Sequence, residues 1–409
     1  MVKNRNKLLQ ASTILFILNI SASALNYLCQ LVMARVLSVE SYGTINTIFS
    51  FLMIIAVPGT TLTMVVAKYY AGDNPDKSRY LKRQLRVVLI LTVAVFVVLL
   101  IGQELFGKVL SIGDNFVIMM AFILAALGYF QPLYSGVFSG NKLFILVGAY
   151  SLCIPLYKLI AVGGAYVYSD VDKTRLYVLL IIMVIGVLAT TVYGQLKSKK
   201  IIGHDMAQPC SKGKLYSTDD VNAFILNISL MLYMNIDLLS VRYYGNETES
   251  GLYSSALLFG RIIYYFATTL GTILLPSVAS DINEETRKKT LNKTLILMIG
   301  FAIVCMLPIN IFKDFFIQIL YGENYIPATK YVIFVSIISL SLSIYTIMVN
   351  YVVGIGRTKA TTIIMVIVDL LLLGTVLLVH EINIILMLIG LIGVIGAIAI
   401  YILCNKGKA

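Results

Sequence analysis

The sequence predicts an all-α polytopic membrane protein, with twelve transmembrane helices in two parallel six-helix lobes around a central cavity. Three observations lead to this prediction. The 409-residue chain is 59% hydrophobic and only 13% charged, whereas a soluble domain has about 25% charged residues. Twelve apolar runs each approach or exceed the roughly 20 residues that cross the hydrocarbon core of a bilayer. Basic residues are distributed unequally between alternate connections of these runs.

The predicted helices follow one another with short polar connections. The basic start "MVKNRNKLLQ" leads into an apolar run that continues to Met33. This run is too long for the apolar core of a cleaved signal peptide, so we interpret it as the first membrane helix. The twelve predicted helices span residues 10–33, 44–67, 87–106, 116–138, 143–167, 176–196, 221–241, 252–279, 294–312, 331–355, 360–379 and 382–404.

The distribution of Lys and Arg predicts the orientation. With the N-terminus inside, 23 of the 32 basic residues fall in cytoplasmic segments and seven in external loops, Arg35 and Arg242 among them. The other two, Lys158 and Arg261, fall inside predicted helices. Because cytoplasmic connections of membrane proteins are enriched in Lys and Arg, we expect both termini in the cytoplasm.

The longest polar segment, residues 197–220, follows the sixth predicted helix. It divides the chain into an N-terminal six-helix lobe (1–200), a cytoplasmic linker (201–220) and a C-terminal six-helix lobe (221–409). A shift of 208 residues places Gly43 on Gly251, and seven of the 20 positions in 43–62 then match 251–270. Since six helices return the chain to its starting side, the two lobes should be parallel repeats.

Four ionisable residues fall inside the predicted helices: Lys158, Asp237, Arg261 and Asp369. Charges in the hydrocarbon region are costly and mark functional sites by default. Arg261 either pairs with Asp237 and stabilises the second lobe, or faces the cavity with Lys158 and binds an anionic headgroup. A third alternative is that the helix boundary is misplaced and Arg261 lies near water. Asp237 and Asp369 are candidates for coupling to H⁺ or Na⁺, or are structural carboxylates with satisfied hydrogen bonds.

Other classes of site lack support in the sequence. There is no phosphate-binding "GxxxxGK[ST]" motif and no Ser/His/Asp grouping, so we expect a protein that is not an enzyme. The five cysteines show no paired spacing, which argues against a metal site or a disulfide framework. We expect no cofactor, and membrane lipids rather than nucleic acid as partners. Gly390, Gly393 and Gly396 lie on nearly one helix face, which predicts close helix packing.

Four stretches carry a further pattern. They are "MARVLSVESYG" (33–43), "IDLLSVRYYGNETESGLYSSALLFGR" (236–261), "LLPSVAS" (274–280) and "ILYGENYIPA" (319–328). Together they resemble the polysaccharide-transporter (Wzx-type oligosaccharide flippase) family of the multidrug/oligosaccharidyl-lipid/polysaccharide exporter superfamily. The resemblance extends over most of the chain and implies a MATE-like fold.

The resemblance also implies a function. A member of this family would translocate undecaprenyl-diphosphate-linked oligosaccharide repeat units from the cytoplasmic to the external leaflet of the bacterial inner membrane. The product would be a surface polysaccharide such as O-antigen or capsule, and polysaccharide polymerase and glycosyltransferases would be partners. Arg261 occupies the family's "LGR" position, which implies substrate binding, whereas Lys158 is assigned from its depth alone.

Three other functions stay open at this point. An ion-coupled drug or metabolite antiporter of the same superfamily would need Asp237 or Asp369 in a proton or sodium site. A lipid II or spore-envelope flippase usually has fourteen helices, more than the twelve predicted here. A membrane scaffold without transport activity does not account for charges buried at mid-depth.

Overall fold

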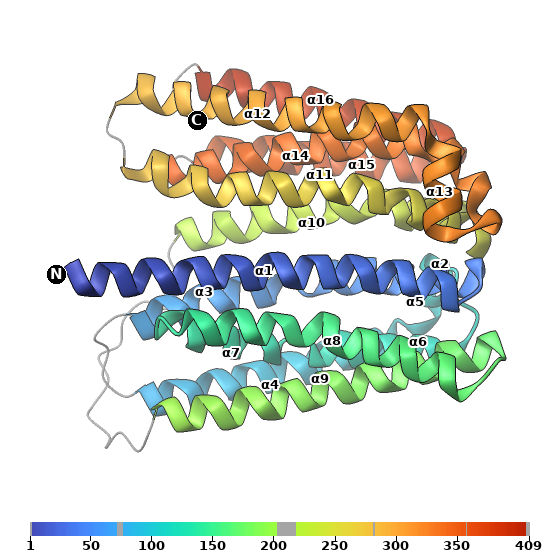
Figure 1. The fold of residues 1–409 in the computed structure, drawn as a ribbon, viewed down its shortest axis with the longest axis horizontal. Helices are drawn as coiled ribbons and strands as arrows, with labels where there is room; N and C mark the ends of the chain where they lie inside the picture. The colour runs from blue at the N-terminus through green and yellow to red at the C-terminus, as the bar shows by residue number, and fades with distance from the viewer. Residues whose placement is uncertain (1, 72–76, 203–217, 281–282, 357, 406–409) are drawn as a thin grey trace. The chain divides into compact units, whose positions relative to one another are not determined.

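The computed structural model describes residues 2–71, 77–202, 218–280, 283–356 and 358–405. These residues are almost entirely helical and include no β-strand (Figure 1). Eleven helices are long and apolar enough to cross a membrane, or up to twelve if one bent pair counts as a single span. The predicted all-α, multi-pass architecture is therefore confirmed.

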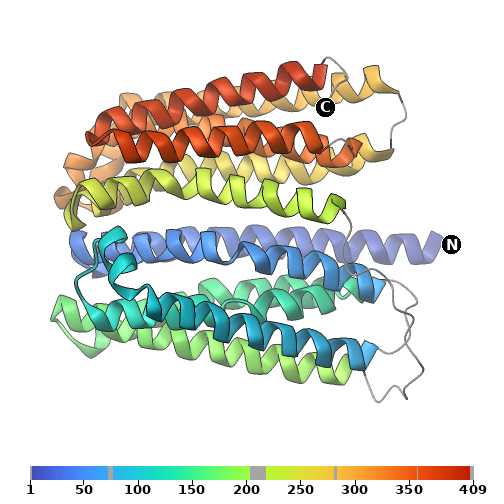
Figure 2. The same cartoon turned by 180° about the vertical axis from the view of Figure 1, so that it is seen from behind.

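The chain forms two compact units, each a bundle of helices (Figures 1 and 2). Unit 1 comprises Met1–Ser41 and Ile55–Ser217, and unit 2 comprises Tyr42–Ile54 and Thr218–Ala409. The helices of unit 1 are α1 (Val2–Val36), α3 (Val57–Ala71), α4 (Lys77–Ile101), α5 (Gln103–Val109), α6 (Asn115–Leu127), α7 (Phe130–Gly140), α8 (Phe144–Tyr168) and α9 (Asp172–Ile202). Unit 2 contains most of α2 (Val39–Ile55), together with α10 (Thr218–Tyr244), α11 (Glu247–Ser280), α12 (Glu284–Ile311), α13 (Lys313–Tyr321), the 3₁₀ helix η1 (Glu323–Tyr331), α14 (Val332–Ile355), α15 (Lys359–Leu378) and α16 (Ile382–Asn405).

The two units differ from the predicted lobes in one segment. Residues 42–54 belong to unit 2, although the linear division at residue 200 places them in the N-terminal lobe. Most of the predicted linker, residues 203–217, lies outside the described residues. The division into lobes 1–200 and 221–409 stays a prediction.

The second predicted helix, 44–67, is interrupted. α2 ends at Ile55, α3 begins at Val57, and the two are bent by 44°. Pro58 explains the break, because its ring lacks the N–H for the helical bond and clashes with the preceding turn. The Tyr129 hydroxyl donates to the Ile55 carbonyl at 2.7 Å and so satisfies a backbone acceptor at the break.

The repeat is visible in the helix boundaries. α2 starts at Val39 and α11 at Glu247, a separation of 208 residues that equals the sequence shift. The equivalent glycines of the two helices touch, since a Cβ atom on Gly43 would lie 2.5 Å from the backbone nitrogen of Gly251. Only glycine permits so close an approach of two backbones.

The glycines of α16 pack against tyrosine hydroxyls from other helices of unit 2. A Cβ atom on Gly393 would lie 1.7 Å from the Tyr233 hydroxyl, and one on Gly396 would lie 1.8 Å from the Tyr345 hydroxyl. The Tyr233 hydroxyl in turn shares a hydrogen bond with Ser341 of α14. These contacts confirm the close packing that the glycine spacing predicts.

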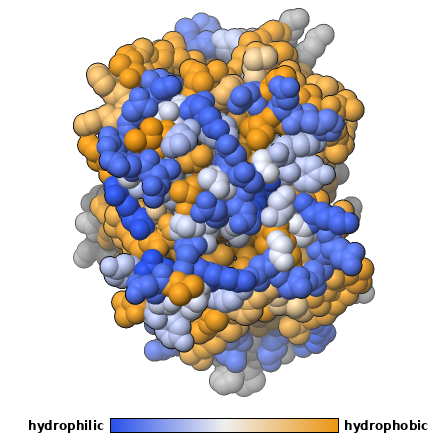
Figure 3. All heavy atoms as spheres, turned by 90° about the vertical axis from the view of Figure 1, so that its right-hand side faces the viewer, coloured by the Kyte–Doolittle hydropathy of each residue, from blue (hydrophilic) through white to orange (hydrophobic). Residues whose placement is uncertain are grey.

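The surface separates into apolar and polar regions. Large apolar side chains are exposed along the helix sides, for example Val93 (56%) in unit 1 and Ile296 (71%) in unit 2. Hydrophilic residues gather at the helix ends seen from the right-hand side of Figure 1 (Figure 3). The hydrocarbon core of a bilayer solvates exposed apolar side chains on the helix sides, whereas the polar helix ends contact water.

We predict that Gly393→Ala destabilises unit 2. The added methyl group would collide with the Tyr233 hydroxyl and break its bond to Ser341. Overpacking of this kind costs about 1–3 kcal/mol, which should appear as a lower Tm of the detergent-purified chain in circular dichroism. Gly374→Ala in α15 is the matched control, because nothing lies within 4 Å of its added methyl group. Equal Tm values for the two variants would contradict the packing described.

Asp114 links two helices of unit 1 at their ends. Its carboxylate caps α6 by accepting from the Phe116 N–H at 2.9 Å. The same carboxylate accepts from the Tyr177 hydroxyl at 2.5 Å and pairs with Lys173 Nζ at 3.0 Å, both on α9. Burial alone would raise the pKa of Asp114, but these hydrogen bonds outweigh it and lower the pKa below its ordinary value.

We predict that Asp114→Ala lowers the free energy of unfolding at pH 7 by about 0.5–2 kcal/mol, as loss of a helix cap does. A carboxyl with a lowered folded-state pKa stabilises above its unfolded-state pKa and loses this effect as pH falls through the folded value. The Tm difference between wild type and variant should therefore shrink below about pH 4. Glu104→Ala, which removes an exposed carboxylate of α5, is the charge-matched control. A Tm difference that is constant from pH 7 to pH 3 would refute the assignment.

Candidate functional site

Arg261 lies on α11 and is 6% exposed. It lines a small cavity inside unit 2, with about 10 Å³ for the centres of water molecules, enough for about one water. The other lining residues come from α10, α11 and α14: Met234, Asp237, Leu257, Gly260, Tyr264, Ile338, Ser339 and Leu342. A permanent cation is thus enclosed in a mostly apolar site.

Asp237, the nearest candidate partner, is occupied elsewhere. Its carboxylate accepts from the Tyr253 hydroxyl at 2.7 Å and from the Leu238 N–H at 2.7 Å. Arg261 acts on Asp237 electrostatically, yet these two described residues form no ion pair. Arg261 Nε has no hydrogen-bond partner. The interpretation of Arg261 as half of a structural ion pair is therefore not supported by contact.

Close packing of α11 on α14 brings the cavity walls together. A Cβ atom on Gly260 would lie 1.9 Å from the Ser339 hydroxyl, so the residue before Arg261 must be glycine for this approach. Asp237 is placed by α10, where it is 1% exposed. Helices α10, α11 and α14 thus meet at the cavity that Asp237 and Arg261 line.

Asp369 occupies a separate place in unit 2. Its carboxylate on α15 accepts from the Ser229 hydroxyl of α10 at 2.5 Å. Ser229 is 1% exposed, and Tyr345 of α14 is an electrostatic neighbour of Asp369. The carboxylate is half-buried and has a hydroxyl donor, which is compatible with both a structural role and an ion-coupling role.

Lys158 belongs to unit 1. It is half-buried on α8, and its Nζ donates to Asn26 Oδ1 of α1 at 3.2 Å. Two helical turns earlier on both helices, Ser151 donates to Asn19 at 3.2 Å. Lys158 is therefore one rung of a polar ladder between α1 and α8. A joint role with Arg261 stays a prediction, because the two residues lie in different units.

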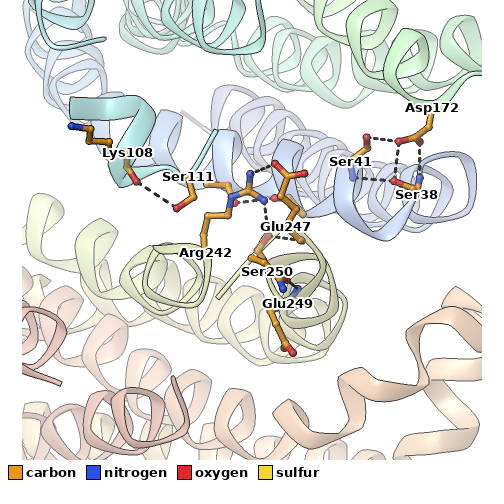
Figure 4. A network of polar contacts seen from close by, with 12 residues as sticks. Ser38, Ser41, Lys108, Ser111, Asp172, Arg242, Glu247, Glu249 and Ser250 are labelled. Atoms are coloured by element: carbon orange, nitrogen blue, oxygen red, sulfur yellow. Dashed lines mark hydrogen bonds and ion pairs between the residues drawn. The ribbon is translucent and has the colours of Figure 1, made fainter. Parts of the chain in front are cut away.

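Arg242 is a buried cation. The predicted helix 221–241 places it at the start of an external loop, but α10 extends to Tyr244, so Arg242 lies in the last turn of this helix and is 0% exposed. Its guanidinium donates to Glu247 Oε1 at 2.8 Å and to Ser250 Oγ at 3.2 Å (Figure 4). The apolar run ends before Arg242, so hydropathy alone could not show that the start of α11 folds over it.

The stretch "MARVLSVESYG" crosses from unit 1 into unit 2. On its unit 1 side, Asp172 accepts from the Ser38 N–H at 2.7 Å and from the Ser41 hydroxyl at 2.5 Å (Figure 4). On its unit 2 side, the Tyr42 ring packs edge-on against Tyr325, with centroids 5.9 Å apart. The turn between α1 and α2 is therefore held by the bonds of Ser38 and Ser41 to Asp172 and by the packing of Tyr42 on Tyr325.

The chemistry of the site follows from its residues. A guanidinium presents several N–H donors in a fixed plane, which suits a phosphate or carboxylate group. The described residues include no group of three or more His, Cys, Asp or Glu side chains that could hold a metal ion. Among the predicted site residues, Asp237 and Arg261 share a cavity, while Asp369 and Lys158 each have other partners.

Comparisons with known proteins support the fold. No protein-family model matches the chain, and no curated protein matches it by sequence. A structure of the lipid II flippase MurJ, in an inward closed conformation, has a TM-score of 0.71 at 16% identity and covers 95% of this chain and 86% of its own. An inward-facing multidrug resistance MATE transporter of the MOP superfamily has a TM-score of 0.69 at 13% identity, covering 94% of each chain.

A third structure extends this group. A MOP superfamily transporter from Pyrococcus furiosus, described as having a binding pocket of reverse polarity, has a TM-score of 0.64 at 14% identity and covers 98% of this chain and 95% of its own. At such low identities the likeness concerns the fold. The chain is a multi-pass membrane protein that has the fold of the MATE and MurJ transporters of the MOP superfamily.

Proposed function

We propose that the chain is a flippase that translocates undecaprenyl-diphosphate-linked oligosaccharide repeat units from the cytoplasmic to the external leaflet by alternating access. Surface polysaccharide, such as O-antigen or capsule, would be the end product. The protein would lie in the bacterial inner membrane with both termini cytoplasmic. Polysaccharide polymerase and glycosyltransferases would act before or after it on the same lipid-linked sugars.

One observation carries the proposal. Arg261 is buried in unit 2 with an unpartnered Nε, and Asp237 in the same cavity is bonded to Tyr253 instead. An intramembrane cation costs several kcal/mol unless a ligand or partner compensates it. A diphosphate supplies the negative charge and the acceptor oxygens that a guanidinium binds best. Arg261 also lies on the "LGR" position of the resembled flippase family.

The size of the cavity bears on the mechanism. The cavity has room for about one water and is too small for a diphosphate, so the proposal requires a second conformation in which the substrate reaches Arg261. Alternation between closed and open forms is what an alternating-access transporter requires. Lys158 would contribute a second positive charge, with its Nζ donating to Asn26 Oδ1.

We predict that Arg261→Ala strongly reduces export. In a host whose own copy of the gene is deleted, the variant should reduce surface polysaccharide by roughly ten- to a hundredfold, the factor for losing a hydrogen bond to a charged group worth about 1.5–3 kcal/mol. Lipid-linked oligosaccharide should accumulate, as measured by mass spectrometry of extracted lipids. Arg261→Lys keeps the charge but loses the planar donor set, so it should retain part of the activity.

The control for charge loss is Lys289→Gln. Lys289 is exposed at the start of α12 and pairs with Glu285 at 2.7 Å, so its loss should leave export unchanged. Immunoblotting of membrane fractions must show equal amounts of all variants. Full export by Arg261→Ala at normal protein level would rule out the proposed diphosphate site.

An ion-coupled drug or metabolite antiporter is the second candidate. The observation in its favour is Asp369, a half-buried carboxylate held by the Ser229 hydroxyl within the membrane span of α15. Carboxylates in such positions can carry a coupling H⁺ or Na⁺. Asp237 is the other candidate, although its bonds to Tyr253 and to the backbone give it a structural explanation.

A drug-efflux assay separates the two functions. As a flippase, the chain should leave ethidium efflux from cells unchanged whether it is present, deleted or carries Asp369→Asn. As an antiporter, it would raise efflux severalfold, and Asp369→Asn would remove this effect while Asp369→Glu would retain part of it. Efflux that depends on the chain and on Asp369 would decide for the antiporter.

A further inference from the structure

The first turns of α4 carry a row of basic residues on one exposed helix face. Arg79, Lys82, Arg83 and Arg86 are all exposed, and their spacing of three, one and three residues places them together on one side. We call this row the α4 basic face. The opposite side of the same turns is buried, through Leu81, Gln84 and Val88.

The α4 basic face continues directly into a lipid-exposed surface. Beyond Arg86 the exposed side chains become apolar, with Val87 at 45%, Ile90 at 62% and Val93 at 56%. From Arg79 to Arg86 the helix rises about 10 Å. The headgroup layer on each side of a bilayer is roughly 5–8 Å thick. With the apolar surface beyond Arg86 in the hydrocarbon core, the basic face would lie at the depth of the lipid phosphates.

Aromatic packing holds this part of α4 in place. The rings of Tyr69 and Tyr80 stack with centroids 3.6 Å apart, and the Tyr70 hydroxyl donates to the Lys77 carbonyl at 2.8 Å. The Lys77 ammonium turns inward and donates to the Tyr70 carbonyl at 3.3 Å. The four residues of the basic face are thus presented on a fixed helix, with Lys77 excluded from it.

Lys82, Arg83 and Arg86 of this face have no acidic counterpart nearby in the described part of unit 1. Five acidic residues are described there, and all lie at the opposite ends of its helices: Glu40, Glu104, Asp114, Asp170 and Asp172. The end of α9, at the same end of unit 1 as the start of α4, adds three more exposed cations, Lys197, Lys199 and Lys200 (Figures 1 and 2). Lys82, Arg83 and Arg86 form no ion pair with a described residue.

Helix α12 of unit 2 provides an internal comparison. It has the same place in the order of spans as α4, and it also begins with basic residues. Two of its four cations are neutralised within the helix, because Lys288 pairs with Glu284 at 3.4 Å and Lys289 with Glu285 at 2.7 Å. The first ten residues of α12 include these two acids, whereas the first ten of α4 include none. Basic residues at this place in a unit therefore do not have to stay unpaired.

We propose that the α4 basic face binds the phosphate groups of anionic phospholipids in the adjoining leaflet. Clusters of four or more Lys and Arg at the membrane surface attract anionic headgroups, each cation contributing to the attraction. The apolar surface beyond Arg86 would receive the acyl chains of the same lipids. This binding does not depend on what the chain transports.

The absence of Trp from the chain allows a direct test. Val87→Trp places a single fluorophore below the basic face, and Ile296→Trp places one on the exposed side of α12. Each full-length protein is reconstituted in phosphatidylcholine that contains brominated phosphatidylglycerol or brominated phosphatidylcholine. Quenching then reports the local preference for the anionic lipid. At Val87→Trp we expect a preference of at least about fivefold, the contribution of one basic side chain near the surface.

Two comparisons separate lipid binding from damage to the fold. Arg83→Gln/Arg86→Gln in the Val87→Trp protein should reduce the preference at least about twofold, whereas Lys288→Gln/Lys289→Gln should leave it unchanged. With the basic face intact, raising the salt from 0.05 to 0.5 M should also weaken the preference, because salt screens surface charges. This second measurement needs no change to the face itself.

Equal quenching by the two brominated lipids at Val87→Trp would overturn the proposal, as would equal preferences at Val87→Trp and Ile296→Trp. In either case the cations of α4 would serve only to set the orientation of the chain. A preference that survives both neutralisation and high salt would overturn it as well, since acyl-chain packing would then explain the result.

Discussion

The lack of water inside a bilayer is the constraint on which the rest of this structure depends. Backbone N–H and C=O groups must bond within the segment, so the chain crosses as long helices, and apolar side chains cover the helix sides. Under this constraint, a broken helix or a buried charge needs a hydrogen-bond partner nearby. At the α2–α3 break, where Pro58 ends the helical ladder, the Tyr129 hydroxyl bonds to the Ile55 carbonyl. At the end of α10, the guanidinium of Arg242 is enclosed by Glu247 and Ser250.

The same constraint governs how the helices associate. Without a hydrophobic force between them, close packing and polar contacts have to hold the helices together. In unit 2, glycines on α11 and α16 admit serine and tyrosine hydroxyls of neighbouring helices, as at Gly260 with Ser339 and at Gly393 with Tyr233. In unit 1, the bonds from Ser151 to Asn19 and from Lys158 to Asn26 connect α8 to α1. Small residues and paired polar groups therefore add to the apolar packing inside each unit.

Charges that this framework leaves unpaired are the ones to which we assign function. Asp237 is bonded to Tyr253, and Asp114 to Tyr177 and Lys173, so structure alone accounts for both. Arg261 is buried with an unpartnered Nε, and Lys82, Arg83 and Arg86 of the exposed α4 basic face form no ion pair with a described residue. The two places differ in depth, and each calls for an anion: a diphosphate for the first and phospholipid headgroups for the second.

The hydropathy pattern, the internal repeat and the glycine spacing of the sequence by themselves determined the all-α, multi-pass fold, most of the spans, the 208-residue offset between α2 and α11 and the close packing at Gly393 and Gly396. These features depend on local composition, which any apolar run of sufficient length expresses. Only the tertiary structure decided that Asp237 bonds to Tyr253 and not to Arg261, that Arg242 is buried, and that residues 42–54 pack in unit 2. Each of these outcomes depends on which helices lie side by side. Contacts between side chains of different helices produce no periodic pattern in a single sequence. Only the three-dimensional arrangement of the helices shows them.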